Sequence, residues 1–477
     1  MQSYYRVLVP RLNGEEIGRN FSRYLSLVKK GVAGFIVFGG RLSEVRKHIA
    51  LLQSEAQLPL IIASDLERGL GQQLRGGTPF PPAMALAQAA RRKRADREHF
   101  ELSRFRKVCS AVAEEAAYAG INTIFAPVLD INTNPRNPII AQRAFGADAP
   151  TVSLLGCEMV KVFQSFGIAA CGKHFPGHGD TEVDSHISLP VIRRPIAALR
   201  KTELRPFRDA IGAGVKMIML GHLKVPALDP SGVPVTLSPR AVSFLKRKMR
   251  YGGIVITDAM NMGGIAGYSE EAASLMALTA GVDIILHPSN ADRVAAYLRA
   301  RKAPLETARI EEFRRDLLSS PAKERPDFRK NTMLSRAVTE RALTVSGSLR
   351  LRGRSCLVIL NDEEDDRSGP LVRELRKGLA GLKVIRLTRS SGTERFPQAE
   401  GLQVVAAIFS ETRGWKGGAG NWLHDALSRL AGRGKIFISF GSPYLLDGIE
   451  GAATLFAYWD SPFTQEAVAR LLLSKVL

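Results

Sequence analysis

The chain has 477 residues, of which 45% are hydrophobic and 24% charged, and this ordinary globular composition leaves room for two or three domains. No run of eighteen apolar residues occurs, which excludes a membrane-spanning helix, and the first twenty residues lack an apolar core long enough for a signal peptide. The net charge of +21 is spread along the chain, and its densest cluster, at 91–100, is mixed with acids and lacks interleaved aromatics. Because the chain has no zinc-finger or RNP-type motif, this charge distribution predicts a solvated arginine-rich surface and no specific nucleic-acid partner.

Short apolar runs rich in β-branched residues alternate with longer amphipathic stretches over the first three hundred residues. They lie at 5–10, 34–40, 58–65, 122–131, 167–174, 215–222, 252–260 and 282–288. Because the runs are apolar throughout, they predict parallel strands buried on both faces. About eight such strands predict a (β/α)8 TIM-type barrel over residues 1–318, with an open doubly wound sheet as the structural alternative.

Polar or charged side chains follow most of these apolar runs. They are Asp65, Asp130, Lys173 with His174, His222, Asp258 and His287. In a barrel the carboxyl ends of the strands open onto one face, where side chains from distant parts of the sequence converge. One polar residue after a strand needs no special explanation, but six such strand ends indicate a site.

The composition changes after the barrel. Residues 319–345 are charged and contain prolines, which predicts a linker. Five more apolar runs, separated by amphipathic helical patterns, occupy 346–477 and predict a smaller α/β/α sandwich domain. The four cysteines show no paired or metal-type spacing, which indicates reduced thiols and, with no signal peptide seen, a cytoplasmic protein.

Three of the eight histidines lie between residues 171 and 190. His174 and His178 have the H-x3-H spacing of a zinc site, but Pro176 and Gly177 between them prevent the helix that would align both rings. A metal site within the loop remains an alternative. A structural role, in which the ring of His178 pins a tight turn, is the second interpretation.

The third interpretation is acid–base catalysis. Asp184 precedes His186 by two residues, close enough for a hydrogen bond within a loop. A neighbouring carboxylate fixes the tautomer of an imidazole and raises its pKa, which makes a competent general acid and later a general base. A D-x-H pair needs a partner elsewhere in the chain to carry this chemistry.

The segment KHFPGHGDTEVDSHISLP at 173–190 resembles the signature of family 3 glycoside hydrolases, in particular their β-N-acetylglucosaminidase branch. Further blocks resemble those of the family in the family's order; they lie at 63–69, 78–87, 125–146, 221–239, 252–265 and 280–286. Two stretches, 441–446 and 457–473, resemble the second domain of the longer members.

The resemblance implies a role for each matching residue. Asp258, in VITDAM, matches the nucleophile, and His186 with Asp184 matches the acid/base pair carried on a mobile loop. The sugar-holding positions fall on Asp65, Arg143, Lys173 and His174, and His222 takes a supporting position. The chain departs from the family at Arg68, which stands where a small residue is common, so the preference for the leaving group is open.

These roles predict a retaining exo-β-N-acetylglucosaminidase that acts on amino-sugar glycosides or muropeptides from the cell wall, as a monomer, without a metal or organic cofactor. A phosphorylase is the alternative within the same chemistry, because a histidine acid/base carries no negative charge to repel phosphate. A non-catalytic glycan-binding protein on the same scaffold is the alternative from another class.

Overall fold

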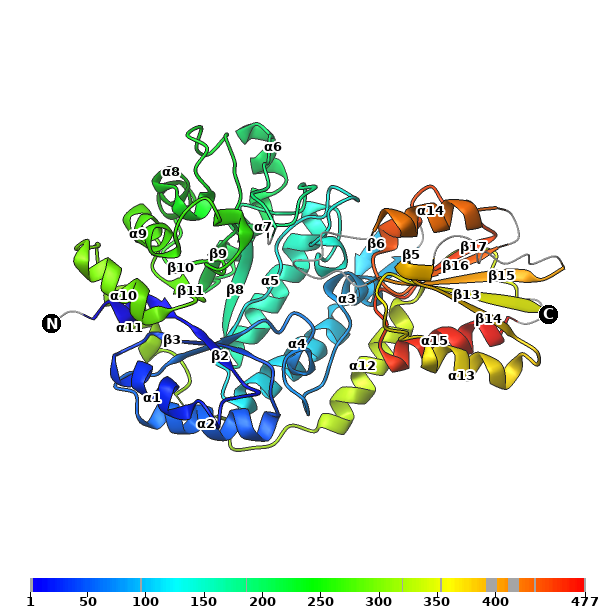
Figure 1. Cartoon of the computed structure of the whole chain (residues 1–477), viewed down its shortest axis with the longest axis horizontal. Helices are drawn as coiled ribbons and strands as arrows, with labels where there is room; N and C mark the ends of the chain where they lie inside the picture. The colour runs from blue at the N-terminus through cyan, green and yellow to red at the C-terminus, as the bar shows by residue number, and fades with distance from the viewer. Residues whose placement is uncertain are drawn as a thin grey trace. The chain divides into compact units, whose positions relative to one another are not determined.

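The computed structural model describes residues 3–94, 97–185, 187–319, 321–351, 354–391, 401–410, 420–432 and 435–475. The chain forms two compact units, which are shown with their elements in Figure 1. Unit 1 consists of Met1–Phe80, Arg106–Asn137 and Ala144–Thr332, and unit 2 of Pro81–Phe105, Pro138–Arg143 and Met333–Leu477. Each unit is therefore assembled from segments that are separate in the sequence.

Unit 1 contains a barrel of parallel strands. Its strands are β1 (Leu8–Val9), β2 (Arg11–Asn13), β3 (Gly34–Phe38), β4 (Ile61–Ser64), β7 (Thr123–Ile124), β8 (Ala169–Phe175), β9 (Met217–Leu220), β10 (Ile254–Thr257) and β11 (Ile285–Leu286). The sheet runs in the order β10-β9-β8-β7-β4-β3-β2, and β1 pairs with β11. Only Pro10 separates β1 from β2, and a bridge from Ile256 to Ile284 joins β10 to the residue before β11. The pairing thus runs around a ring, and the predicted barrel is confirmed.

The burial of these strands explains why the apolar runs predicted them. Every residue of β4, β8, β9 and β10 is buried, as expected for strands covered on both faces. The helices that follow or precede them are α1 (Phe21–Lys29), α2 (Leu42–Ser54), α4 (Leu102–Ala119), α5 (Ala149–Ser165), α6 (Ile196–Lys201), α7 (Leu204–Gly212), α8 (Pro239–Ser243), α9 (Glu270–Ala280), α10 (Ala291–Ala300) and α11 (Ala308–Arg315). Side-chain caps start several of them; Asp148, for example, accepts from Thr151 N at 2.8 Å at the start of α5.

Unit 2 contains a six-stranded sheet in the order β12-β17-β16-β15-β13-β14. The strands are β12 (Thr344–Gly347), β13 (Ser355–Asn361), β14 (Lys383–Leu387), β15 (Gln403–Phe409), β16 (Ile436–Ser439) and β17 (Ala453–Phe456), and only β12 is antiparallel to its neighbour. Helices α13 (Gly369–Gly378) and α15 (Pro462–Leu473) cover one face and α14 (Asn421–Leu430) the other (Figure 1).

Alternate residues of β13 pack on opposite faces of this sheet. Leu357 and Ile359 lie in the core with α13 and α15, whereas Val358 and Leu360 lie in the core with α14. This period of two is the geometry of a strand covered on both sides. The unit is the three-layer α/β/α sandwich that the sequence predicts.

Two parts of the chain contain elements that the sequence did not predict. The segment predicted as a linker contains α12 (Phe328–Ala342). The arginine-rich cluster forms an antiparallel hairpin of β5 (Arg91–Arg94) and β6 (Arg97–Phe100), which follows α3 (Ala83–Ala90) in unit 2. Its strands lack the alternation of apolar and polar residues by which a strand is recognised. None of the described helices combines the length and apolar content that a membrane crossing requires.

Candidate active site

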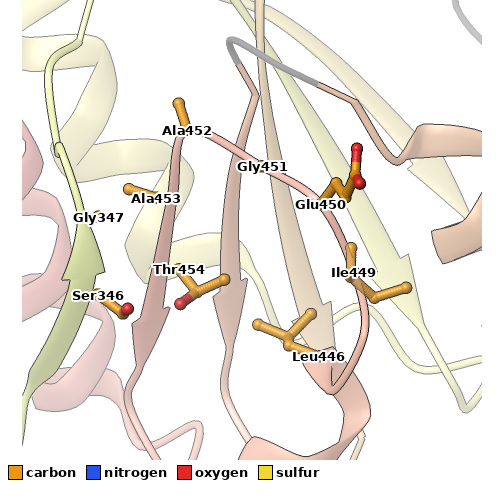
Figure 2. Close-up of a pocket in the computed structure, with 9 residues that line it drawn as sticks. All are labelled: Ser346, Gly347, Leu446, Ile449, Glu450, Gly451, Ala452, Ala453 and Thr454. Atoms are coloured by element: carbon orange, nitrogen blue, oxygen red, sulfur yellow. The ribbon is translucent and has the colours of Figure 1, made fainter.

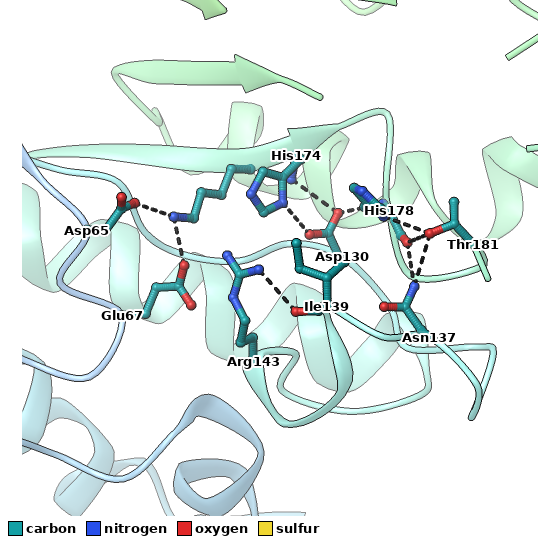
Figure 3. A network of polar contacts seen from close by, with 10 residues as sticks. Asp65, Glu67, Asp130, Asn137, Ile139, Arg143, His174, His178 and Thr181 are labelled. Carbon is teal, nitrogen blue, oxygen red and sulfur yellow. Dashed lines mark hydrogen bonds and ion pairs between the residues drawn. The ribbon is translucent and has the colours of Figure 1, made fainter. Parts of the chain in front are cut away.

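Lys173 and Asp65 lie together at the carboxyl ends of β8 and β4. Lys173 Nζ is 2.6 Å from Asp65 Oδ1 and 2.7 Å from Glu67 Oε1 (Figure 3). The lysine side chain is 3% exposed and that of Glu67 10%, whereas that of Asp65 is 27% exposed. Glu67 therefore binds the buried side of the ammonium group, and Asp65 is the carboxylate that a ligand can reach. No role was predicted for Glu67, whose signal in the sequence is its position two residues after Asp65.

Asp130, at 0% exposure, organises the histidine-rich stretch. Its Oδ2 lies 2.7 Å from His174 Nδ1, and its Oδ1 accepts from the backbone N of His174 at 3.1 Å and of His178 at 2.7 Å (Figure 3). Burial raises the pKa of Asp130, but the charges and hydrogen bonds of the two histidines outweigh it and hold the pKa below its usual value. Because an ionised carboxylate only accepts, His174 Nδ1 carries a proton, and Nε2 is the nitrogen that can meet a ligand.

His178 is held as part of the structure. Its Nδ1 lies 2.8 Å from Thr181 Oγ1, and its carbonyl accepts from Asn137 Nδ2 at 2.8 Å. Burial lowers the pKa of His178 to about 4, so the ring is neutral at neutral pH. This agrees with the predicted pinning of a tight turn. Among the described residues, no three or more His, Cys, Asp or Glu side chains are grouped so that they could hold a metal ion.

Asp258 directly follows β10 and is half-buried. Its backbone N donates to Leu220 O at 3.0 Å, and its Oδ1 accepts from Ala259 N at 2.8 Å. Burial raises the pKa of the Cys171 thiol, and the nearby charges of Asp65 and Asp258 raise it further. Both carboxylates therefore act on the same point of β8, as expected for residues at one end of the barrel.

His222, at the end of β9, supports the residue after Asp258. It is completely buried; its Nδ1 lies 2.8 Å from Thr236 Oγ1 and its Nε2 3.0 Å from Ala259 O. Since a carbonyl only accepts, Nε2 donates to it. The loop that carries Asp258 is thereby fixed at Ala259 to the neighbouring strand.

Asp184 and Ser185 lie in a tight turn and are almost fully buried. Asp184 O accepts from the backbone N of Ile187 at 3.0 Å and of Ser188 at 3.1 Å. His186 lies outside the described residues, so its pairing with Asp184 stays a prediction. Ser185 O accepts from Gly264 N at 2.8 Å, which links this turn to the loop after Asp258.

Arg143 is the one predicted sugar-holding residue that belongs to unit 2. Its Nη1 donates to Ile139 O at 3.1 Å (Figure 3). Unit 1 thus brings Asp65, Lys173, His174 and Asp258 to the carboxyl ends of its strands without it. A pocket of about 450 Å³ in unit 2, lined by residues of β12, β17 and the 446–452 stretch, contains none of the predicted site residues (Figure 2).

Comparison with known proteins agrees with this arrangement. Residues 22–317 match the family model described as glycosyl hydrolase family 3 N terminal domain. Beta-hexosaminidase A of Pseudoalteromonas piscicida is 34% identical over 324 residues, which cover 62% of this chain and 52% of the relative. A beta-N-acetylglucosaminidase/beta-glucosidase of Cellulomonas fimi is 32% identical over 290 residues, which cover 58% and 50%. The chain thus spans about half the length of these two relatives.

Solved structures of family 3 enzymes are also similar over the whole chain. The family 3 beta-N-acetylglucosaminidase from Paenibacillus sp. strain FPU-7 superposes with a TM-score of 0.79 at 27% identity and covers 100% of this chain and 98% of that one. The family match spans more than half of the sequence and includes the barrel strands from β3 onwards. The resemblance carried by the histidine-rich stretch is confirmed, and the chain belongs to glycosyl hydrolase family 3.

Proposed function

We propose that this protein is a retaining exo-β-N-acetylglucosaminidase that releases terminal β-linked N-acetylglucosamine from cell-wall fragments. The observation that carries the proposal is the carboxylate of Asp258 at the end of β10, on the barrel edge that also presents Asp65, Lys173 and His174. Relatives named beta-hexosaminidase and the Paenibacillus beta-N-acetylglucosaminidase support the same substrate class.

The sugar is held by a polar clamp. Asp65 accepts hydrogen bonds from sugar hydroxyls, while Lys173 donates to them; the role of Arg143, which belongs to unit 2, stays a prediction. Glu67 supports this clamp, because it binds Lys173 Nζ at 2.7 Å and keeps the ammonium group beside Asp65. The proton that Asp130 places on His174 Nδ1 leaves His174 Nε2 for the sugar.

Bond cleavage proceeds in two steps. The carboxylate of Asp258, whose Oδ1 accepts from Ala259 N, attacks the anomeric carbon while the bond from that carbon to the leaving oxygen breaks. His186, oriented by Asp184, gives its proton to the leaving oxygen. It then takes a proton from a water molecule, whose oxygen attacks the anomeric carbon and releases Asp258. The two steps together retain the configuration at the anomeric carbon.

The wall-fragment substrate is supported by charge. Muropeptides carry carboxylates, and a chain with a formal net charge of +21 attracts anionic molecules. The net charge favours the approach of an anionic substrate, whereas the clamp selects the sugar. We propose a cytoplasmic location for this reaction, in the turnover of peptidoglycan.

Trapping the covalent intermediate tests the proposal. A fluorinated N-acetylglucosaminyl donor should modify the peptide that contains Asp258, as located by mass spectrometry, and Asp258→Ala should abolish release of nitrophenol from nitrophenyl N-acetylglucosaminide. Asp209→Ala, on the surface of α7, is the matched control and should keep full turnover. A label on a different carboxylate, or turnover by Asp258→Ala, would contradict the assignment. In phosphate buffer the product should be N-acetylglucosamine; its 1-phosphate would indicate a phosphorylase instead.

A further inference from the structure

The loop after Asp258 and the turn that contains Asp184 are joined at Gly264. This residue lies in a short 3-10 segment, Gly263–Ile265, and its backbone N donates to Ser185 O at 2.8 Å. Ser185 follows Asp184 and precedes His186 in the sequence. This backbone hydrogen bond therefore connects the segment of the proposed acid/base pair to the loop of the proposed nucleophile.

The space around Gly264 admits no side chain. A Cβ built on Gly264 would lie 2.8 Å from His222 Cβ and 3.0 Å from Ser185 O. Neither neighbour is the far end of a flexible side chain. His222 is completely buried and held through both ring nitrogens, by Thr236 Oγ1 at 2.8 Å and Ala259 O at 3.0 Å. An added methyl group would therefore push the Ser185 carbonyl rather than the histidine.

His222 supports both loops at once. On one side His222 Nε2 donates to Ala259 O, and the backbone N of Ala259 donates to Asp258 Oδ1 at 2.8 Å. On the other side its Cβ packs against Gly264, which binds Ser185. The contacts thus form a chain from Asp258 through Ala259, His222 and Gly264 to the turn at 184–188.

We infer that Gly264 is a positioning residue that sets the distance between the acid/base segment and the nucleophile, with His222 as the common support. The inference rests on the proposed function, because it takes Asp258 and the pair Asp184–His186 in the roles given above. Gly264 touches neither the sugar nor the reacting atoms, and it acts through the carbonyl of Ser185.

A displaced proton donor has a specific kinetic signature. An alkyl aglycone is a poor leaving group and needs a proton in the first step, whereas dinitrophenolate leaves without one. A misplacement of about 1 Å can reduce a rate about 100-fold. A shifted Ser185 should therefore slow the alkyl glycoside and spare the dinitrophenyl glycoside, whereas general damage to the barrel would slow both.

The test compares Gly264→Ala with Gly267→Ala. Gly267 is exposed in the same loop, and a Cβ there meets nothing within 4 Å. We expect kcat/KM of Gly264→Ala to fall roughly 10- to 100-fold for the methyl N-acetylglucosaminide and less than about threefold for the dinitrophenyl one. Gly267→Ala should match the wild type on both. Equal losses on the two substrates, or none with Gly264→Ala, would overturn the inference.

Two further outcomes keep the inference and the proposed function apart. If the wild type hydrolyses neither glycoside, or Asp258→Ala remains active, the proposed function fails. If the wild type and Asp258→Ala behave as proposed but Gly264→Ala behaves as Gly267→Ala, the inference alone fails. Hydrogen exchange on the wild type gives a measurement that does not depend on the folding of a variant. The Gly264 amide should exchange slowly, and exchange as fast as that of a solvent-exposed amide would refute the contact with Ser185.

Discussion

Replacing Asp130 with asparagine should loosen the histidine-rich stretch while keeping the shape of the side chain. The carboxylate accepts from His174 N, His178 N and His174 Nδ1 at 3.1, 2.7 and 2.7 Å. A hydrogen bond to an ionised group contributes about 1.5–3 kcal/mol, against about 0.5–1.5 kcal/mol for a neutral pair. Three bonds that each lose about 1 kcal/mol cost about 3 kcal/mol together. The lowered pKa of Asp130 means that the charged form is favoured despite its burial, so the loss is not regained by removing the charge.

Hydrogen exchange followed by mass spectrometry measures this local effect. A cost of about 3 kcal/mol corresponds to about a 100-fold loss of protection at pH 7 in peptides that cover residues 169–181. Asp180→Asn is the matched control, because Asp180 is only half-buried and accepts from Thr133 Oγ1 at 3.1 Å. Protection in β13 of unit 2 should not change in either variant. Equal protection in Asp130→Asn and Asp180→Asn would refute the reasoning.

Two more predictions concern neighbouring residues. Glu67→Gln removes the carboxylate that binds Lys173 Nζ beside Asp65, so binding of N-acetylglucosamine should weaken about tenfold by calorimetry. Unchanged affinity would show that Glu67 does not support the clamp. Burial lowers the pKa of His178 to about 4, whereas a histidine in the unfolded chain has a pKa of about 6.5. Because the unfolded chain binds the proton at the higher pH, the free energy of unfolding should fall as the pH drops from about 6.5 to 4. His178→Gln should reduce this slope by about one proton in denaturant titrations, and an unchanged slope would assign the acid sensitivity to other groups.

The sequence predicted the barrel well because its strands are buried on both faces. LPLIIASD and GGIVITDAM are apolar in their buried strands up to the last strand residues, Ser64 and Thr257, and the aspartate that follows each of these marks the open edge of the barrel. Asp65 and Asp258 were found in this way. The same reasoning predicted the sandwich, since β13 is buried throughout and apolar from Cys356 to Leu360.

The sequence did not reveal a helix whose buried face is largely polar, or contacts that depend on residues distant in the sequence. The buried face of α12 includes Asn331, Ser335 and Thr339 beside Val338 and Ala342, so the helical period is present but three of these five residues are polar. A search for apolar periodicity therefore passes over this helix. The role of Glu67 depends on Lys173, which a different strand supplies. The link from Gly264 to Ser185 is a backbone contact, which no side-chain pattern can signal.

The make-up of unit 2 has a consequence for how the chain is made. The 81–105 segment, which includes α3, emerges from the ribosome long before residues 333–477, with which it forms a compact unit. All residues of α3 except Gln88 are buried, so the nascent chain must keep this helix covered or tolerate its exposure until residues 333–477 have been made. A gene truncated after residue 332 would keep the 81–105 segment without most of the unit to which it belongs, so an expression design aimed at the barrel alone has to replace or remove that segment.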